Sequence, residues 1–182
     1  DNILAWMTPE TDGVLAVRRN AISWLESNFG SQYGILPGYQ YAYGFGEGEE
    51  QYVTYYQVAA IQSAISNMGV RYNMGAYSFH ATQRVLMPDA VLQSGSGICI
   101  ETAVLMASVL ESAGMHAMIV LTPGHAQTAV ETWSGSGQYF LIETTCLPFT
   151  ATEDGLNSLI TPLDNQGWAD YLAQNEQRAQ ES

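Results

Sequence analysis

Lysine is absent from the sequence, and the 182 residues carry five arginines against 18 acidic side chains. The resulting formal net charge of −13 would repel phosphate backbones and anionic membrane surfaces. We therefore expect no nucleic-acid partner, and we expect cationic or neutral molecules to be favoured. The lack of lysine and the many Tyr, Ser, Gln and Gly residues are typical of exported proteins, so we expect an extracellular or cell-surface location.

Cysteine is scarce, since Cys99 and Cys146 are the two in the chain. Two cysteines cannot form a scaffold of several disulfides, although a single Cys99–Cys146 disulfide is one alternative. They are also too few for a zinc site without histidine ligands. His80, His116 and His125 include no closely spaced pair of the kind that binds zinc from one helix, so we expect no metal and no cofactor.

Long apolar runs are missing as well. No run of 18 uninterrupted apolar residues occurs, and the first residues lack a basic-then-apolar signal pattern, so we expect no membrane insertion. Hydrophobic residues still make up 47% of the chain, which is enough for one core. We predict a single domain over residues 1–182, with N-terminal helices and a Tyr/Gly-rich loop over 1–76, a central core over 77–147 and C-terminal helices over 148–182.

Helical spacing of apolar residues is present in several segments, and glycine or proline marks where they start or stop. Pro88 suits a first helical position, and Gly95 ends the short segment that follows it. Gly114 ends the most apolar helix of the chain. These patterns predict a short helix between Pro88 and Gly95 and further helices over residues 11–29, 52–68, 98–113, 153–159 and 165–179.

Between the predicted helices over 98–113 and 153–159, the apolar residues follow the spacing of strands. Three segments are rich in aromatic and β-branched residues, and the second and third should pair antiparallel across the turn residues "SGSG". We therefore predict an α+β fold in which an antiparallel sheet of at least three strands wraps around the helix over 98–113, with Trp24, Trp133 and Trp168 packed around that helix. The predicted strands cover residues 116–122, 125–133 and 138–145.

The segment "SGSGICIETAVLMASVLESAGM" places Cys99 in the first turn of that apolar helix. Unpaired N–H groups and the positive end of the helix dipole stabilise a thiolate at such a position. Gly95 and Gly97 allow a close backbone approach and leave room for a substrate carbonyl beside the N–H of Cys99, which is a candidate oxyanion donor. A cysteine on an apolar helix is more often a small core residue, so Cys99 needs partners before chemistry is inferred.

Two residues on the predicted strands are candidate partners for the thiol. His125 follows Pro123-Gly124 at the start of a strand, where a rigid sheet can aim the imidazole as a general base. Glu143 lies among apolar and neutral neighbours on the next strand, and its carboxylate is suited to orient the imidazole. The order helix-Cys, strand-His, next-strand acid predicts a Cys99–His125–Glu143 triad, with Gly97 and Gly124 as substrate-binding positions.

These segments resemble the transglutaminase-like cysteine enzymes, which belong to the papain-like superfamily. The resemblance rests on "QRVLMPDAVLQSGSGICIETAVLMASVLESAGMHAMIVLTPGHA" and on "YFLIETT", about a third of the chain. It implies a transglutaminase-like, papain-like core with Cys99 as nucleophile, His125 as general base and acid, and Glu143 as orienting acid. Two departures are visible, because the common acid is Asp and the residue after Gly-His-Ala, here Gln127, is often aromatic.

The resemblance also implies a second oxyanion donor upstream of the cysteine. Gln83 stands at the position of the family pattern, and Gln93 has a papain-like spacing of six before Cys99. Gln83 is preferred, because Gln93 is expected to lie on the short helix that precedes the glycines.

The activity that these features predict is cleavage of an amide by a cysteine protease or amidase through a thioester. The expected substrate is a peptide or protein, such as a cell-wall peptide. Three alternatives stay open at this point: a cross-linking acyltransferase, an inactive module that binds a peptide or glycan, and a structural domain locked by a Cys99–Cys146 bridge.

Overall fold

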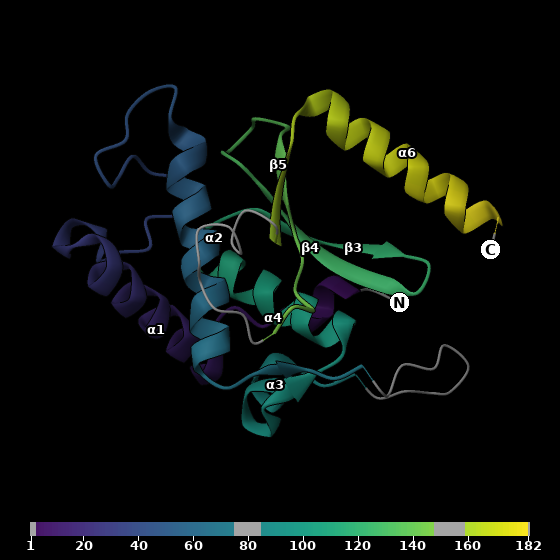
Figure 1. The fold of residues 1–182 in the computed structure, drawn as a ribbon, viewed down its shortest axis with the longest axis horizontal. Helices are drawn as coiled ribbons and strands as arrows, with labels where there is room; N and C mark the ends of the chain where they lie inside the picture. Colours follow the sequence, from purple (N-terminus) through teal and green to yellow (C-terminus); the bar gives the residue numbers. More distant parts are fainter. Residues whose placement is uncertain (1–2, 75–84, 148–158, 182) are drawn as a thin grey trace.

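The computed structural model describes residues 3–74, 85–147 and 159–181. These residues form five α-helices and an antiparallel sheet of four strands (Figure 1), which confirms the predicted α+β class. The helices lie within about two residues of the predicted segments. They are α1 (Asp12–Phe29), α2 (Glu50–Asn67), α3 (Pro88–Ser94), α4 (Cys99–Ser112) and α6 (Asn165–Glu181), and short 3-10 turns cover Ile3–Trp6 and Ser31–Tyr33.

Helix α4 is the centre of the molecule. Its residues from Cys99 to Leu110 are all buried, as expected of a helix that is apolar on every side. Its N-cap is Ile98, whose side chain cannot accept a hydrogen bond, so the carboxylate of Glu101 has a larger part in closing the helix start. Oε1 of Glu101 accepts the N–H of Ile98 at 3.0 Å and Oε2 accepts the N–H of Leu86 at 2.6 Å.

The sheet has the strand order β3 (Ala117–Thr122), β4 (His125–Glu131), β5 (Tyr139–Ile142) and β6 (Ile160–Leu163), with antiparallel neighbours throughout. The three predicted strands and the pairing of the second with the third are confirmed. Strand β6 was not predicted, because "ITPL" has four residues and a proline in its middle. The helix predicted over 153–159 lies, apart from its last residue, outside the described residues.

Proline is accommodated in β6 by its place at the edge of the sheet. The N–H of Glu143 donates to the carbonyl of Leu159 at 2.9 Å, which fixes the alternation of hydrogen bonds along the pair. The backbone groups of Ile160 and Pro162 therefore point away from β5, toward the outer edge of the described sheet. Pro162 costs no ladder hydrogen bond there and removes one free donor from the edge.

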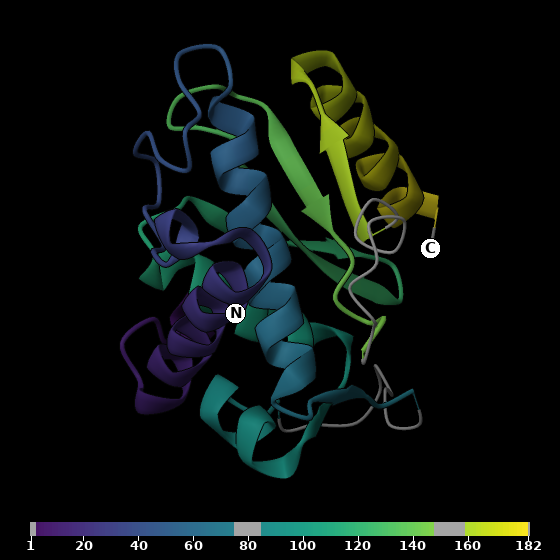
Figure 2. The same ribbon diagram turned by 60° about the vertical axis from the view of Figure 1, so that its left-hand side comes forward.

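The two faces of the sheet are covered differently. Among the described helices, α4, α2 and α1 lie on one side of the sheet and α6 lies on the other (Figures 1 and 2). Trp24 and Trp133 pack against the core that includes α4, as predicted. The prediction was wrong for Trp168, which stacks on Tyr139 of β5 with ring centroids 4.4 Å apart, because α6 leaves it on the outer face.

A short parallel pair holds the segment before α4. Strand β1 (Arg71–Tyr72) pairs with β2 (Ser96–Gly97), and this pair brings Tyr72 to the start of α4. Within the described residues, no helix has the length and apolar character needed to cross a membrane.

Candidate active site

Cys99 is the first residue of α4, and the residue is 4% exposed. It belongs to a small apolar cluster with Ala103 of α4 and Ala126 of β4. Burial raises the pKa of the Cys99 thiol, and the N–H groups of Ala126, Ile100 and Cys99 itself only partly offset this rise. The charge of Glu143 adds to the rise. The helix start therefore does not ionise this thiol by itself, and a base is needed.

His125 is the first residue of β4, directly after the turn that Gly124 makes with a φ of +76°. Its Nε2 lies 3.1 Å from Oε2 of Glu143. This contact occupies one ring nitrogen and leaves Nδ1 for another partner. The next residue, Ala126, belongs to the same apolar cluster as Cys99, so the start of β4 lies near the start of α4.

Glu143 follows the last residue of β5 and receives four hydrogen bonds. Oε1 accepts the N–H and the hydroxyl of Thr145 at 3.1 and 2.7 Å, and Oε2 accepts from His125 and from Nε2 of Gln127 at 3.1 and 2.9 Å. Burial alone would raise the pKa of Glu143, but the four donors outweigh it and the pKa is lowered. The carboxylate is therefore ionised and fixed in direction at neutral pH.

The strand register explains why these side chains meet. Continued by one residue, the β4–β5 pairing sets Gln127 opposite Glu143, and His125 lies two residues along the same face. The hydroxyl of Tyr171 in α6 donates to Oε1 of Gln127 at 3.0 Å. Neither Gln127 nor Tyr171 was predicted to act at the site, since a contact over 44 residues has no local signal.

The side chain of Thr102 ties the first turn of α4 to the segment after β5. The hydroxyl of Thr102 lies 3.1 Å from the carbonyl of Cys99 and 3.2 Å from the hydroxyl of Thr144. Both threonines are buried. The helix start and the residue after Glu143 are thus held in one hydrogen-bonded unit.

Tyr72 is a neighbour of the thiol that the sequence did not single out. It packs against the cluster that contains Cys99. Burial raises the pKa of Tyr72, and the charges of Cys99 and Glu143 raise it further.

The two predicted glycines have different structural reasons. A Cβ on Gly97 would lie 3.2 to 3.3 Å from side-chain atoms of Val91, Glu101 and Thr102, so packing alone demands a small residue there. Gly124 is needed for the positive φ of the β3–β4 turn, and a Cβ there would meet no atom within 4 Å.

Gln83, the preferred second oxyanion donor, lies outside the described residues. Gln93 lies on α3, as expected, and it is exposed.

Metal ligands are not gathered anywhere in the described ranges, where no group of three His, Cys, Asp or Glu residues could hold an ion. His116 instead pairs with Glu131 at 3.0 Å, and His80 lies outside the described residues. Cys99 and Cys146 are both free, the first buried and the second exposed. The structure therefore contains no bridge between them.

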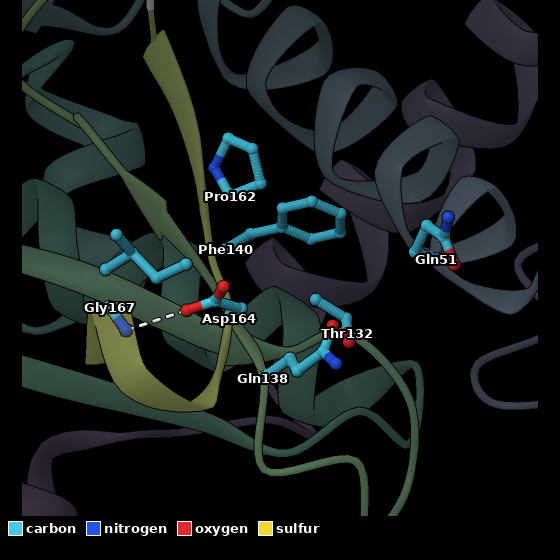
Figure 3. Close-up of a pocket in the computed structure, with 8 residues that line it drawn as sticks. Gln51, Thr132, Gln138, Phe140, Pro162, Asp164 and Gly167 are labelled. Atoms are coloured by element: carbon cyan, nitrogen blue, oxygen red, sulfur yellow. Dashed lines mark hydrogen bonds between the residues drawn. The ribbon is translucent and has the colours of Figure 1, made fainter. Parts of the chain in front are cut away.

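A separate hollow of about 420 Å³ opens between the start of α2 and the edge of the sheet. Figure 3 shows Phe140 and Pro162 on the strands facing Gln51 of α2, with Asp164 accepting the N–H of Gly167 below them. Its lining includes none of the three candidate catalytic residues, so this hollow is distinct from the site around Cys99.

Comparison with known proteins supplies one finding. A family model described as the transglutaminase-like superfamily matches residues 39–171, which is more than half of the chain and includes Cys99, His125 and Glu143. Neither the curated proteins nor the solved structures give a significant match.

Proposed function

Because this chain belongs to the transglutaminase-like superfamily, whose members are generally thiol-based enzymes, we propose that it cleaves an amide bond through a thioester acyl-enzyme. The observation that carries the proposal is the 3.1 Å contact between His125 and Glu143, at the start of the strand whose next residue, Ala126, clusters with Cys99. A buried thiol with a raised pKa gains reactivity when an imidazole held by a carboxylate accepts its proton.

The proposed reaction proceeds in two steps. Nδ1 of His125 takes the thiol proton, and the Cys99 sulfur forms a bond to the carbonyl carbon. The tetrahedral intermediate collapses when the carbon–nitrogen bond breaks and His125 gives the proton to the leaving amine. Water then attacks the thioester with His125 as base, which releases the carboxylic acid and the thiol. Attack by a second amine instead of water would make the protein a cross-linking acyltransferase.

The negative oxygen of the intermediate needs donors that lie in place before the reaction. The backbone N–H of Cys99, at the start of α4, is the first donor that we propose. Gln83 is the second, on the resemblance of its sequence position alone. Gly97 and Gly124 flank the proposed substrate path on either side of the thiol and the imidazole.

The substrate that we propose is a peptide or protein outside the cytoplasm, such as a cell-wall peptide. This proposal is supported by the charge of −13 and the absence of lysine, which favour cationic or neutral substrates.

The experiment that tests the proposal is the rate of alkylation of Cys99 by iodoacetamide at pH 6. Cys146 is exposed, so Cys146→Ser is the background and mass spectrometry locates the label. We expect stoichiometric labelling of Cys99 that is at least tenfold slower in His125→Ala. A peptide library with and without an added amine then separates hydrolysis from transfer. A rate no faster than that of a free thiol contradicts the proposal.

One observation favours a second candidate, an inactive module that binds a peptide or glycan. Cys99 is only 4% exposed and its surroundings are apolar, as for a core cysteine. This candidate predicts slow alkylation in the folded protein and no effect of His125→Ala on the rate.

A further inference from the structure

We propose that Gln127 and Tyr171 are positioning residues that aim the carboxylate of Glu143 at His125, and that α6 is thereby a working part of the active site. This inference rests on the proposed function and adds a role for two residues outside the triad. Its basis is a continuous chain of hydrogen bonds from α6 through β4 to Glu143, with donor–acceptor distances of 3.0 and 2.9 Å.

The chain of hydrogen bonds has one consistent direction. The amide of Gln127 must turn Nε2 toward Glu143, because its carbonyl oxygen would otherwise face a carboxylate that can only accept. Oε1 of Gln127 is then left as an acceptor, and the hydroxyl of Tyr171 donates to it. The tyrosine therefore stabilises the orientation of the amide that suits an ionised Glu143.

The direction of the carboxylate follows from the same contacts. Gln127 and His125 share Oε2 of Glu143, while Thr145 occupies Oε1 with two donors. Without Gln127, the imidazole would be the single donor on Oε2, and rotation of the carboxylate about its last torsion would be restricted less, by His125 and Thr145 alone. Gln127 therefore limits where His125 can find its acceptor.

Helix α6 is attached to the sheet by few side chains, and Tyr171 is among them. Most residues of α6 are exposed. Trp168 stacks on Tyr139 of β5 at 4.4 Å and on Tyr171 at 5.8 Å, which holds the tyrosine ring over the outer face of the sheet. Figures 1 and 2 show α6 lying along that face. The stacked rings thus place the hydroxyl that orients Gln127.

The test is the pH dependence of Cys99 alkylation by iodoacetamide in the full chain, with Cys146→Ser as background. Gln127→Met keeps the shape and removes the donor, so we expect the rate at pH 6 to fall about tenfold. Gln127→Glu sets two carboxylates against each other, which must share a proton, so the acid limb of the profile should move to higher pH. Tyr171→Phe should lower the rate at pH 6 about threefold.

The matched control is Tyr139→Phe, which removes a hydroxyl from the same aromatic stack but not from the hydrogen-bonded chain. It should leave the pH profile unchanged. Circular dichroism and thermal melting show whether each variant is folded, and a ¹³C NMR titration of Glu143 gives a second readout that a purely structural role would not move. The lowered pKa of Glu143 should rise in Gln127→Met.

The outcomes separate this inference from the function beneath it. A reactive Cys99 whose pH profile is the same in all folded variants overturns the role of Gln127 and Tyr171 alone. An inert Cys99 in the unsubstituted protein overturns both proposals. Equal losses in Tyr171→Phe and Tyr139→Phe would assign the effect to packing of α6 and overturn the hydrogen-bonded chain as its cause.

Discussion

Glu143→Gln is the substitution that most directly probes how the site works. The carboxylate can accept four hydrogen bonds, and all four places are filled by Thr145, His125 and Gln127. A glutamine of the same shape has one accepting oxygen and one donating nitrogen. Its oxygen is best placed toward Thr145, whose backbone N–H cannot turn away. The nitrogen then faces His125 and Gln127.

This arrangement forces both neighbours to change. Gln127 can flip its amide, but His125 must present Nε2 without a proton and carry its proton on Nδ1. That tautomer cannot take the proton of Cys99. In addition, the imidazolium form loses a charge-assisted hydrogen bond worth about 1.5–3 kcal/mol, which corresponds to about 10- to 150-fold less of the thiolate–imidazolium pair. Removing the charge of Glu143 also lowers the pKa of Cys99 by ending the repulsion of the thiolate, but this repulsion is the smallest of the causes that act on that pKa.

The assay is the alkylation rate of Cys99 between pH 5 and 10. We expect Glu143→Gln to lower the rate at pH 6 by about 10- to 150-fold and to approach the parent rate at high pH, where the thiol ionises without the imidazole. The control is Glu131→Gln, which alters the contact between Glu131 of β4 and His116, where the two side chains lie 3.0 Å apart. Equal profiles for Glu143→Gln and the parent, or equal losses in both variants, would refute the reasoning.

Three other predictions concern stability and association. Burial alone would raise the pKa of Glu131, but hydrogen bonds from His116 and two glycine N–H groups outweigh burial, and the pKa is lowered. The ionised carboxylate therefore stabilises the folded protein at pH values above its ordinary pKa of 4.5, and this stabilisation is lost in acid. In urea unfolding, Glu131→Gln should cost about 1–2 kcal/mol at pH 7 and progressively less below pH 4.5, whereas a cost independent of pH would contradict this. Gln62 is 3% exposed and neither polar atom of its amide has a partner, so Gln62→Met should leave the free energy of unfolding unchanged or raise it by about 1 kcal/mol, and a clear loss would be inconsistent with an orphaned amide. Pro162→Val adds a donor to the outer edge of β6 and should increase self-association in size-exclusion chromatography, whereas Thr161→Val, whose N–H faces β5, should not.

The parts of the fold that the sequence predicts are those with local signals. Pro88 at the first turn of α3, Gly95 with φ of +70° at its end and the apolar run of α4 act within a few residues of one another. The order of Cys99, His125 and Glu143 also has local signals, and the structure shows His125 and Glu143 in contact at 3.1 Å. The action of the three residues as a triad stays a prediction.

The parts that were not predicted depend on the assembled structure. Strand β6 has four residues and gains its hydrogen bonds only from β5. Cys99 is buried in a cluster that includes Ala126 and against which Tyr72 packs. The cost of this burial to the thiolate depends on residues far apart in the sequence, so it cannot be predicted from the position of Cys99 at a helix start. The contact of Tyr171 with Gln127 needs α6 to fold back over the sheet.

Two His–Glu pairs each include one residue of β4, and their comparison shows what a contact of this type establishes. The distances are 3.0 Å for His116–Glu131 and 3.1 Å for His125–Glu143, and both acids are bracketed by further donors. The His116 side chain is 59% exposed, and the carboxylate of its partner Glu131 accepts the N–H groups of Gly135 and Gly137 in the following turn. That pair therefore stabilises the β4–β5 hairpin. The second pair includes His125, whose neighbour Ala126 clusters with Cys99 at the start of α4. The inference of catalysis therefore depends on the thiol rather than on the pair, which is why the rate at Cys99 is the quantity to compare between Glu143→Gln and Glu131→Gln.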